Sequence, residues 1–264
     1  MLSVRSSCRL LGLSRTVYKY RPDANRDNEV IAALSELVER YPRYGFPKLF
    51  QMLRRKGLVW NHKRVHRVYC KMGLNIRRKG KQRLPNRNPK PLCVPAEANQ
   101  SWSVDFMSDS LFDGRTFRTF NVVDDYNREA LGIEVDLNLP AKRIIRVLER
   151  IAMWRGYPVQ IRCDNGPELV SLAMAEWAEN NGVILEFIQK GKPTQNSFVE
   201  RFNKTYRDEI LDFYIFNTLS EVREITDSWL NEYNLERPHE SLGNLTPVEY
   251  LQEKQPEFSK LVWD

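Results

Sequence analysis

The sequence predicts an α/β protein in which a mixed sheet flanked by helices follows a small helical domain. Three features point to this architecture. Short helical patterns rich in Lys and Arg occupy the front of the chain, a basic segment with several prolines follows, and strand-like runs joined to helical ones begin near residue 99. A length of 264 residues suits one main core with a smaller appendage.

The composition narrows the class of protein. Hydrophobic residues make up 42% and charged residues 28% of the chain, which argues against a mainly disordered polypeptide. No apolar run approaches the roughly 18 residues of a membrane span, and arginines interrupt the apolar N-terminal stretch, so we expect no membrane contact and no secretory signal. The four cysteines form no CxxC pair, so reduced thiols in a cytoplasmic protein are expected.

The formal charge is divided unevenly along the chain. Residues 1–95 contain 23 Lys and Arg against 5 Asp and Glu, a balance of +18. The remaining residues hold 41 − 23 = 18 basic and 34 − 5 = 29 acidic side chains, a balance of −11. A segment this basic repels itself unless it meets a polyanion, so the front of the chain is expected to bind nucleic acid. A basic solubility tail is the alternative, but tails lack the helical periodicity found here.

Three short helices are predicted in residues 28–75, at 28–41, 47–56 and 62–72. Asn61 suits the N-cap of the third helix, whose apolar stripe would face inward. The basic residues on its other faces are candidate DNA contacts, as in a helix-turn-helix domain: Lys63, Arg64, Arg67 and Lys71. A small helical bundle with a solvated basic face fits the same periodicity, which does not separate the two.

Residues 76–98 form a basic, proline-rich linker in this interpretation. Four prolines prevent helix or sheet from persisting, and we expect an extended segment that could also follow a phosphate backbone. Its basic run provides three further candidate DNA contacts: Arg77, Arg78 and Lys79.

From residue 99 the predicted order is strand, strand, strand, helix, strand, helix, strand, helix. The strands are expected at 101–107, 115–123, 129–137, 158–163 and 183–188. Helices are expected from Pro140 to Gly156, at about 168–181, around Glu200, at 219–234 after a Thr218–Glu221 capping box, and after a second capping box at Thr246–Glu249. Three antiparallel strands, two parallel strands and flanking helices in this order describe a ribonuclease-H-like sheet.

Three acids are candidate catalytic residues, and each has a structural alternative. Asp105 is the one acid of its apolar strand, although an exposed face of an edge strand would also tolerate it. Asp164 opens DNGPE, a plausible strand-to-helix turn, but it stands where α/β sheets place ligands. Glu200 could instead close a capping box with Ser197. Asp124 and Asp125 are alternative candidates for the first catalytic acid. They lie at a predicted turn, so we expect both carboxylates to be solvated.

Taken together, the three acids predict one reaction. Phosphodiester cleavage needs an activated oxygen nucleophile and a means of absorbing charge on the phosphate, and two divalent ions provide both. Mg²⁺ or Mn²⁺ takes oxygen ligands from carboxylates on rigid elements. Asp105, Asp164 and Glu200 would hold two ions per active site, and the ions would reverse the repulsion of phosphate by acids.

The sequence resembles the DDE transposases of insertion sequences, of the OrfB type, whose catalytic core is similar to retroviral integrases. Asp164 and Glu200 are 36 positions apart, the spacing typical of that superfamily. The strings that carry the resemblance span nearly all of residues 1–250: RYGFPKLFQMLRRKG, NHKRVHRVY, WSVDF, DGRTFRTFNVVDDYNREAL, DNGPE, GKPTQNSFVERFNKTYRDEIL and NEYNLERPHESLGNLTPVEY.

The resemblance implies roles for particular residues. Asp105, Asp164 and Glu200 would be the catalytic metal ligands, and Arg207, seven positions after the glutamate, would contact DNA near the active site. Arg201 and Lys204 would share the DNA-facing side of the same helix. Lys190 and Lys192 could form a mobile basic loop over the scissile phosphate, or be solvated loop charges.

The resemblance also implies an organisation and a reaction. We expect an N-terminal arm (1–27), a helical DNA-binding domain (28–75), the linker (76–98), an integrase catalytic core (99–213) and a C-terminal helical extension (214–264). The expected activity is metal-dependent cleavage of the element's DNA ends, followed by attack of the 3′-hydroxyl on a target phosphodiester. A non-catalytic DNA-binding protein and a ribonuclease-H-like nuclease with another substrate are the alternatives.

The resemblance also implies binding partners. They would be double-stranded DNA, as transposon ends and target, the upstream-frame OrfA protein or an OrfAB fusion, and further copies of this chain on DNA. The chain begins at a typical OrfB start, so the upstream helix-turn-helix would be supplied by such a fusion. The expected location is the cytoplasm, in association with the nucleoid.

Overall fold

The computed structural model describes residues 3–21, 25–75, 94–189 and 196–258. The chain divides into two compact units, residues 1–79 and 80–264, and each is described by itself. Within the described residues, no helix is both long and apolar enough to span a membrane. The described cysteines are unpaired: Cys8, Cys70 and Cys163.

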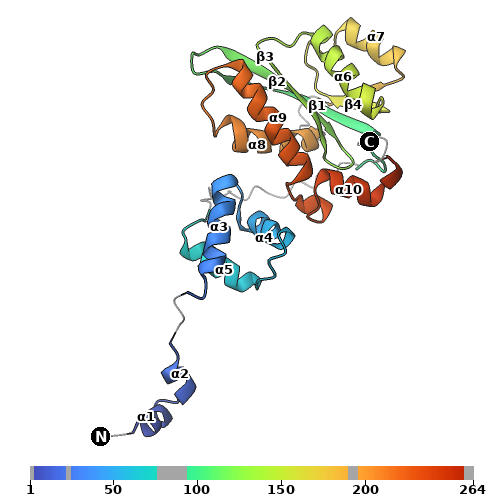
Figure 1. The fold of residues 1–264 in the computed structure, drawn as a ribbon. Coiled ribbons are helices and arrows are strands. Elements are labelled where there is room, and N and C mark those ends of the chain that lie inside the picture. Colours follow the sequence, from blue (N-terminus) through green and yellow to red (C-terminus); the bar gives the residue numbers. More distant parts are fainter. Residues whose placement is uncertain (1–2, 22–24, 76–93, 190–195, 259–264) are drawn as a thin grey trace. The chain divides into compact units, whose positions relative to one another are not determined.

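The first unit is helical (Figure 1). Its helices are α1 (Val4–Leu10), α2 (Arg15–Lys19), α3 (Asn28–Arg40), α4 (Phe46–Arg55) and α5 (His62–Lys71). The last three confirm the helices predicted from periodicity. Their apolar faces meet in one core, in which Leu34, Leu49 and Val65 are almost completely buried. As predicted, Asn61 caps α5: its side-chain oxygen accepts a hydrogen bond from the N–H of Lys63 at 2.8 Å.

The second unit contains a five-stranded mixed sheet in the order β3-β2-β1-β4-β5. Its strands are β1 (Ser101–Ser110), β2 (Thr116–Asp124), β3 (Ala130–Asp136), β4 (Gln160–Cys163) and β5 (Ile184–Phe187). Strands β1, β2 and β3 are antiparallel, whereas β4 is parallel to both β1 and β5. The predicted sheet of three antiparallel and two parallel strands is confirmed, and its order is ribonuclease-H-like.

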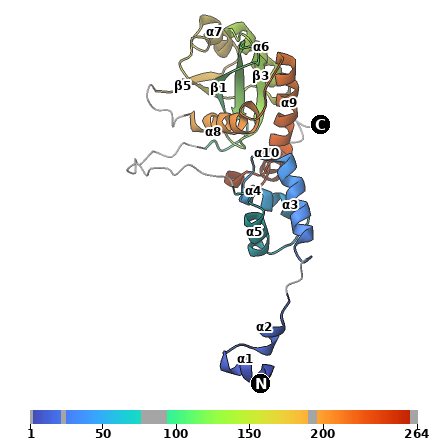
Figure 2. The same ribbon diagram turned by 90° about the vertical axis from the view of Figure 1, so that its left-hand side faces the viewer.

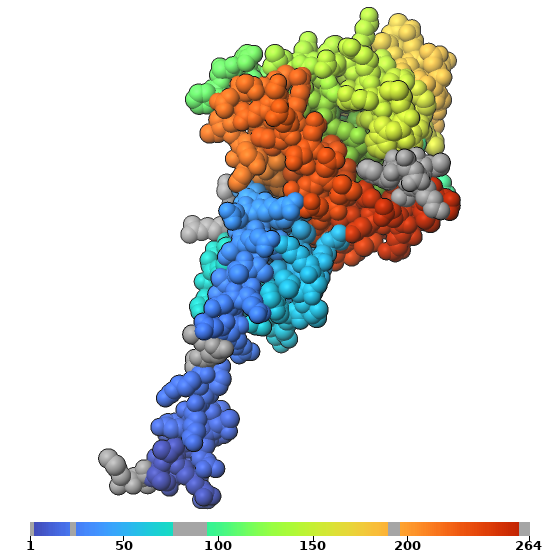
Figure 3. All heavy atoms as spheres, viewed as in Figure 1, coloured from blue at the N-terminus to red at the C-terminus, as the bar shows by residue number. Residues whose placement is uncertain are grey.

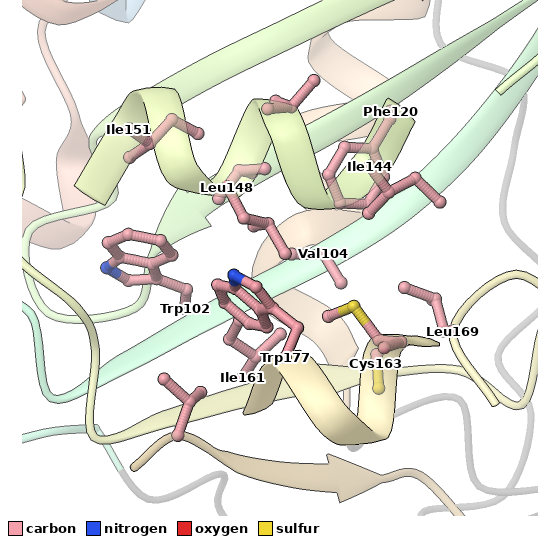
Figure 4. Close-up of a cluster of buried hydrophobic side chains, with 14 of the residues drawn as sticks. Trp102, Val104, Phe120, Ile144, Leu148, Ile151, Ile161, Cys163, Leu169 and Trp177 are labelled. Carbon is pink, nitrogen blue, oxygen red and sulfur yellow. The ribbon is translucent and has the colours of Figure 1, made fainter. Parts of the chain in front are cut away.

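Helices cover both faces of the sheet (Figures 1 and 2). On one face, α6 (Ala141–Arg155) and α7 (Leu172–Asn180) bury an apolar cluster in which Trp102, Val104 and Ile161 of the sheet meet Ile144 and Leu148 (Figure 4). On the other face lie α8 (Ser197–Tyr206), the π-helical turn Arg207–Leu211 and α9 (Leu219–Leu235). The alternation of side chains along β1 therefore decides which residues face α8: Ser103, Asp105 and Met107 rather than Val104.

The C-terminal helices belong to the same compact unit as the sheet. Helix α9 packs on β3, and its Trp229 and Tyr233 share a core with Phe202 and Tyr206 of α8. Helix α10 (Pro247–Lys254) packs against α9, and the orange and red surfaces of these two helices adjoin in Figure 3. The burial of Trp229 in this core shows that α9 helps to fix α8 against the sheet.

The helix boundaries differ from the predictions in particular places. Helix α7 starts at Leu172 rather than near 168, because Ser171 caps it and a loop follows Asp164. The capping box at Thr246–Glu249 is confirmed. At the start of α9, the Thr218 hydroxyl accepts a hydrogen bond from the backbone N–H of Glu221, as the predicted capping box requires. The Glu221 carboxylate, however, accepts from the backbone N–H of Asn217 and not from that of Thr218, so only half of the box forms.

Candidate active site

Asp105 lies in the middle of β1, the central strand of the sheet, on the face turned toward α8. Its Oδ1 accepts the N–H of Phe106 at 2.8 Å, and its Oδ2 accepts the side-chain amide of Asn203 at 2.7 Å. Burial raises the pKa of Asp105 to about 6. The negative charges of Asp164 and Glu200 add to the rise, and the two hydrogen bonds oppose it. The alternative of an exposed edge strand is wrong, because β1 has a paired neighbour on each side.

Asp164 follows directly after β4, the parallel neighbour of β1. In the register of the two strands Ser103 pairs with Arg162, and continuing it by two residues brings Asp105 level with Asp164 on the same face. The Oδ1 of Asp164 accepts the N–H of Gly166 at 3.0 Å, which fixes the carboxylate above the end of the strand. A Cβ at Gly166 would lie 3.0 Å from this Oδ1, so the glycine leaves space that the carboxylate occupies.

Glu200 stands in the first turn of α8, which packs against β1 and β2. The predicted capping box with Ser197 does not form. The N-cap is Asn196, whose amide donates to the carbonyl of Val104 at 3.2 Å, and no side chain caps the helix start. Among the described residues, the Glu200 carboxylate has no hydrogen bond or ion pair. Surrounding protein atoms raise its pKa, although the side chain is largely exposed.

The three carboxylates therefore come from adjacent elements, and the charges of two of them act on the third. The pKa of Asp105 responds to both Asp164 and Glu200, so negative charge accumulates on this face of the sheet. The described residues nevertheless contain no group of three Asp, Glu, His or Cys side chains close enough to form a closed metal site. One oxygen of Asp105 is instead bonded to the amide of Asn203. The donor set, carboxylate oxygens alone, fits a hard divalent cation such as Mg²⁺ or Mn²⁺.

Two asparagines that sequence reasoning missed support Asp105. Asn203 is 8% exposed and Asn121 is fully buried, and the Nδ2 of Asn121 donates to the Oδ1 of Asn203 at 2.7 Å. Asn203 in turn donates to Asp105, so a chain of amides orients the carboxylate. A signal was present, because Asn203 lies three residues after Glu200 on the same side of one helix. Asn121 faces Asp105 across the β1–β2 ladder, a pairing that only the register reveals.

The expectation that Asp124 and Asp125 are solvated is wrong, because both are fully buried. The carboxylate of Asp124 forms an ion pair with the guanidinium of Arg155 at 3.0 Å, and that of Asp125 pairs with Arg162 at 2.8 Å. The hydroxyl of Ser103 also donates to Asp125. Desolvation raises the pKa of Asp125 to about 6 despite these partners. The turn is covered by the rest of the unit, so its acids form an internal ion-pair cluster and not a rival metal site.

The basic residues of α5 differ in their availability. Lys63 and Lys71 are exposed. Arg64 and Arg67 both pair with Asp27, at 3.1 Å and 2.8 Å, so their charges are partly neutralised at the start of α3.

The basic residues predicted near Glu200 also fall into groups. Arg201 is exposed, and Lys204 is exposed but pairs with Asp208 at 2.7 Å. Arg207 is paired with Asp109 at 3.0 Å and donates to the carbonyl of Ser108 at 2.9 Å, which ties the π-helical turn to β1. Five predicted DNA contacts lie outside the described residues: Arg77, Arg78, Lys79, Lys190 and Lys192.

Three protein-family models match the chain. An HTH-like domain matches residues 25–82, and two models of an integrase core domain match residues 95–193 and 181–247. The first of these ranges contains α3–α5, and the other two contain the sheet and the three candidate acids.

Individual proteins are also similar to this chain. An uncharacterized protein of insertion element IS407 from Burkholderia multivorans is 42% identical over 250 residues, covering 94% of this chain and 90% of the relative. The transposase of insertion sequence element IS629 from Shigella sonnei is 25% identical, covering 88% and 83%. Among solved structures, the catalytic core domain of BIV integrase is 16% identical with a TM-score of 0.46, covering 61% of this chain and 99% of that one.

Proposed function

The chain belongs to the integrase-core transposase family of bacterial insertion sequences, and we propose that it cleaves the DNA ends of such an element and joins them to target DNA with the help of divalent metal ions. The observation that carries the proposal is that Asp105 in β1 feels the charges of Asp164, directly after the parallel strand β4, and of Glu200, on the helix packed against β1. A buried carboxylate whose pKa is raised by two neighbouring carboxylates suits cation-assisted phosphate chemistry.

Each residue has a distinct role in this proposal. Asp105, Asp164 and Glu200 would hold two Mg²⁺ or Mn²⁺ ions, and these would supply activation of the attacking oxygen and neutralisation of charge on the phosphate. The backbone N–H groups of Phe106 and Gly166 each fix one carboxylate oxygen, so the two aspartates are oriented before DNA arrives. Glu200, exposed and unpaired among the described residues, completes the set from the helix. The carboxylates remain ligands throughout, so the reaction needs no covalent protein intermediate.

The reaction would proceed in two displacements at this site. In the first, water hydrolyses a phosphodiester at the element end and leaves a 3′-hydroxyl. In the second, that hydroxyl attacks a phosphodiester of the target, and the target's own 3′-oxygen leaves. The same three carboxylates serve both steps because the atoms being exchanged are equivalent oxygens on phosphorus.

DNA would be held by two parts of the chain. The exposed Lys63 and Lys71 of α5 would contact phosphates, and Arg201 and Lys204, on the same helix as Glu200, would do so near the site. Two element ends must be brought together, so further copies of the chain and an upstream-frame OrfA protein or OrfAB fusion are the proposed partners, acting on the chromosome in the cytoplasm.

The test is an end-cleavage assay on labelled duplexes that carry the terminal repeats of the encoding element. The full chain is expected to nick them only with Mg²⁺ or Mn²⁺ present. Asp105→Asn, Asp164→Asn and Glu200→Gln should each bind the duplex normally and abolish cleavage. Glu176→Gln and Asp227→Asn are matched controls, because both remove one exposed carboxylate from helices of the same unit.

The assay also separates the alternatives. Retained cleavage in any of the three site variants would remove that residue from the catalytic set. If the unaltered chain binds DNA without metal and does not cleave it, the chain is a DNA-binding protein and not an enzyme.

A further inference from the structure

The loop that follows β4 carries Asp164 and continues to the start of α7. Its residues 164–171 lie outside any regular helix or strand. The N–H of Gly166 donates to Asp164 near the beginning of the loop, and Leu169 is 1% exposed in the apolar cluster that α6 and α7 bury (Figure 4). Glu168 lies between these two points, in the DNGPE motif, and the proposed reaction gives it no role. Whatever holds Glu168 therefore also holds the loop that carries Asp164.

Glu168 is held by Arg118, which comes from a strand two places away in the sheet. The Nη1 of Arg118 forms an ion pair with the Oε1 of Glu168. Arg118 stands in β2, and β1 separates β2 from β4, so this bridge spans the central strand. Neighbouring strands lie about 4.8 Å apart, and a long side chain is needed to reach across one of them. The arginine thus connects the second strand to the loop of Asp164.

The bridge rests on Phe106, the residue that follows Asp105. The Cζ of Arg118 lies 4.5 Å from the centroid of the Phe106 ring. Phe106 packs in turn on Phe120, with ring centroids 5.1 Å apart, and its N–H donates to Asp105. The guanidinium therefore contacts the neighbour of one candidate metal ligand and pairs with an acid four residues after another.

The ion pair is better suited to fixing a position than to stabilising the fold. The side chain of Arg118 is 29% exposed and that of Glu168 is 19% exposed. Ion pairs that remain accessible to water contribute little to the free energy of unfolding. The position of the guanidinium is nevertheless well defined, because an aromatic ring and a carboxylate both restrain it.

We infer that Arg118 is a positioning residue of the candidate active site: through Glu168 and Phe106 it fixes the loop of Asp164 relative to Asp105. The inference rests on the proposed function, because it concerns two of the same carboxylates. Arg118 and Glu168 act as one unit, so losing either displaces Asp164 in the same way. A role through charge alone has opposite consequences. Removing the cation Arg118 would then strengthen the binding of a divalent ion by the acids, and removing the anion Glu168 would weaken it.

The experiment measures Mn²⁺ binding by the full chain without DNA, by calorimetry, together with the melting temperature. Arg118→Gln and Glu168→Gln are each expected to weaken binding about tenfold, as the loss of a group that orients a metal ligand does. The double variant should lose no more than either single variant. Melting temperatures should stay close to that of the unaltered chain. Arg115→Gln is the control and should leave the affinity unchanged, because it removes the same charge from an ion pair with Asp113 at the tip of the β1–β2 hairpin.

Tighter or unchanged Mn²⁺ binding by Arg118→Gln would overturn the inference, and so would a double variant in which the two losses multiply. Asp105→Asn should abolish the binding, which identifies the site that is being measured. If the unaltered chain binds Mn²⁺ through Asp105 but cleaves no DNA, the proposed function fails and the positioning role stands. If the unaltered chain binds no Mn²⁺ through Asp105, both are wrong.

Discussion

The Nδ2 of Asn203 lies 2.7 Å from the Oδ2 of Asp105, and this hydrogen bond joins α8 to the central strand of the sheet. The bond therefore also fixes the helix that carries Glu200, one turn before Asn203, relative to Asp105. The bond also prevents Asp105 from rotating freely toward Asp164. The separation and orientation of the proposed metal ligands thus depend on an amide that is not itself a ligand.

Removing this amide should weaken metal binding more than folding. Asn203→Ala is expected to lower Mg²⁺-dependent cleavage about 10- to 100-fold, because Asp105 loses the partner that orients it. The half-saturating Mg²⁺ concentration should rise, which a purely structural role would not cause. Asn181→Ala, which removes an amide bonded only to its own helix, is the control. An unchanged Mg²⁺ dependence in Asn203→Ala would contradict the prediction.

The raised pKa of Asp105 predicts how metal-free stability varies with pH. The folded-state pKa is about 6 against the ordinary value of 3.8 for an aspartate, so between these values the folded chain binds the extra proton. The contribution of Asp105 to the free energy of unfolding is therefore retained at low pH and lost as pH rises through about 6. Asp105→Asn should be stabilised relative to the unaltered chain by up to about 3 kcal/mol at pH 7.5, and by much less at pH 4.

The measurement is urea unfolding of both proteins at the two pH values, in chelator. The comparison cancels groups that titrate identically in the two proteins, Asp125 among them. A stability difference that stays constant with pH would show that Asp105 is not the titrating group.

Gly166 is predicted to matter for activity rather than for stability. The Cβ of Gly166→Ala would lie 3.0 Å from Asp164 Oδ1 and 3.4 Å from Glu168 Oε2, so the Asp164 carboxylate must shift. We expect severalfold slower cleavage, with DNA affinity and melting temperature close to those of the unaltered chain. Cleavage kinetics at saturating Mg²⁺ provide the check, and an unaltered rate would mean that the position of Asp164 tolerates displacement.

The buried cation Arg155 should be essential for folding. Its side chain is fully buried and pairs with Asp124 at 3.0 Å and with Glu129 at 2.9 Å. Arg155→Ala leaves two buried acids without this partner and should cost about 3–5 kcal/mol in the free energy of unfolding. Arg146→Ala, an exposed residue on the same helix, should change it by less than about 0.5 kcal/mol. Equal effects of the two variants in urea unfolding would contradict this assignment.

Asp27 is expected to restrain DNA binding by the helical unit. Its carboxylate pairs with Arg64 and Arg67, which hold its pKa below the usual range. Asp27→Asn removes the ion pairs of both guanidinium groups and should increase DNA affinity severalfold, with a steeper salt dependence. Glu36→Gln, which releases Lys56 by the same change of charge, is the control. The prediction is contradicted if both variants shift the salt dependence equally.

Much of the second unit could be predicted from local patterns in the sequence. Alternating apolar and aromatic residues predicted β1, β2 and β3 to within a few positions, because a strand that buries one face must repeat every two residues. Helix α7 was placed less accurately, since a loop and a helix start with similar polar residues and only the Ser171 cap distinguishes them. Asp124 and Asp125 were expected to be solvated but are buried. The burial of a turn residue depends on segments distant in the chain, which local patterns do not reveal.

The sequence by itself determined which acids could act together, through their residue types, their strand and helix positions and the spacing of Asp164 from Glu200. Only the tertiary structure decided that Asp164 follows the strand parallel to β1 closely enough to raise the pKa of Asp105, that Asn196 and not Ser197 begins α8, and that Asn203 holds Asp105. The reason is physical. Periodicity and capping act over a few residues, whereas register and hydrogen bonds between elements depend on how strands and helices far apart in the chain pack together.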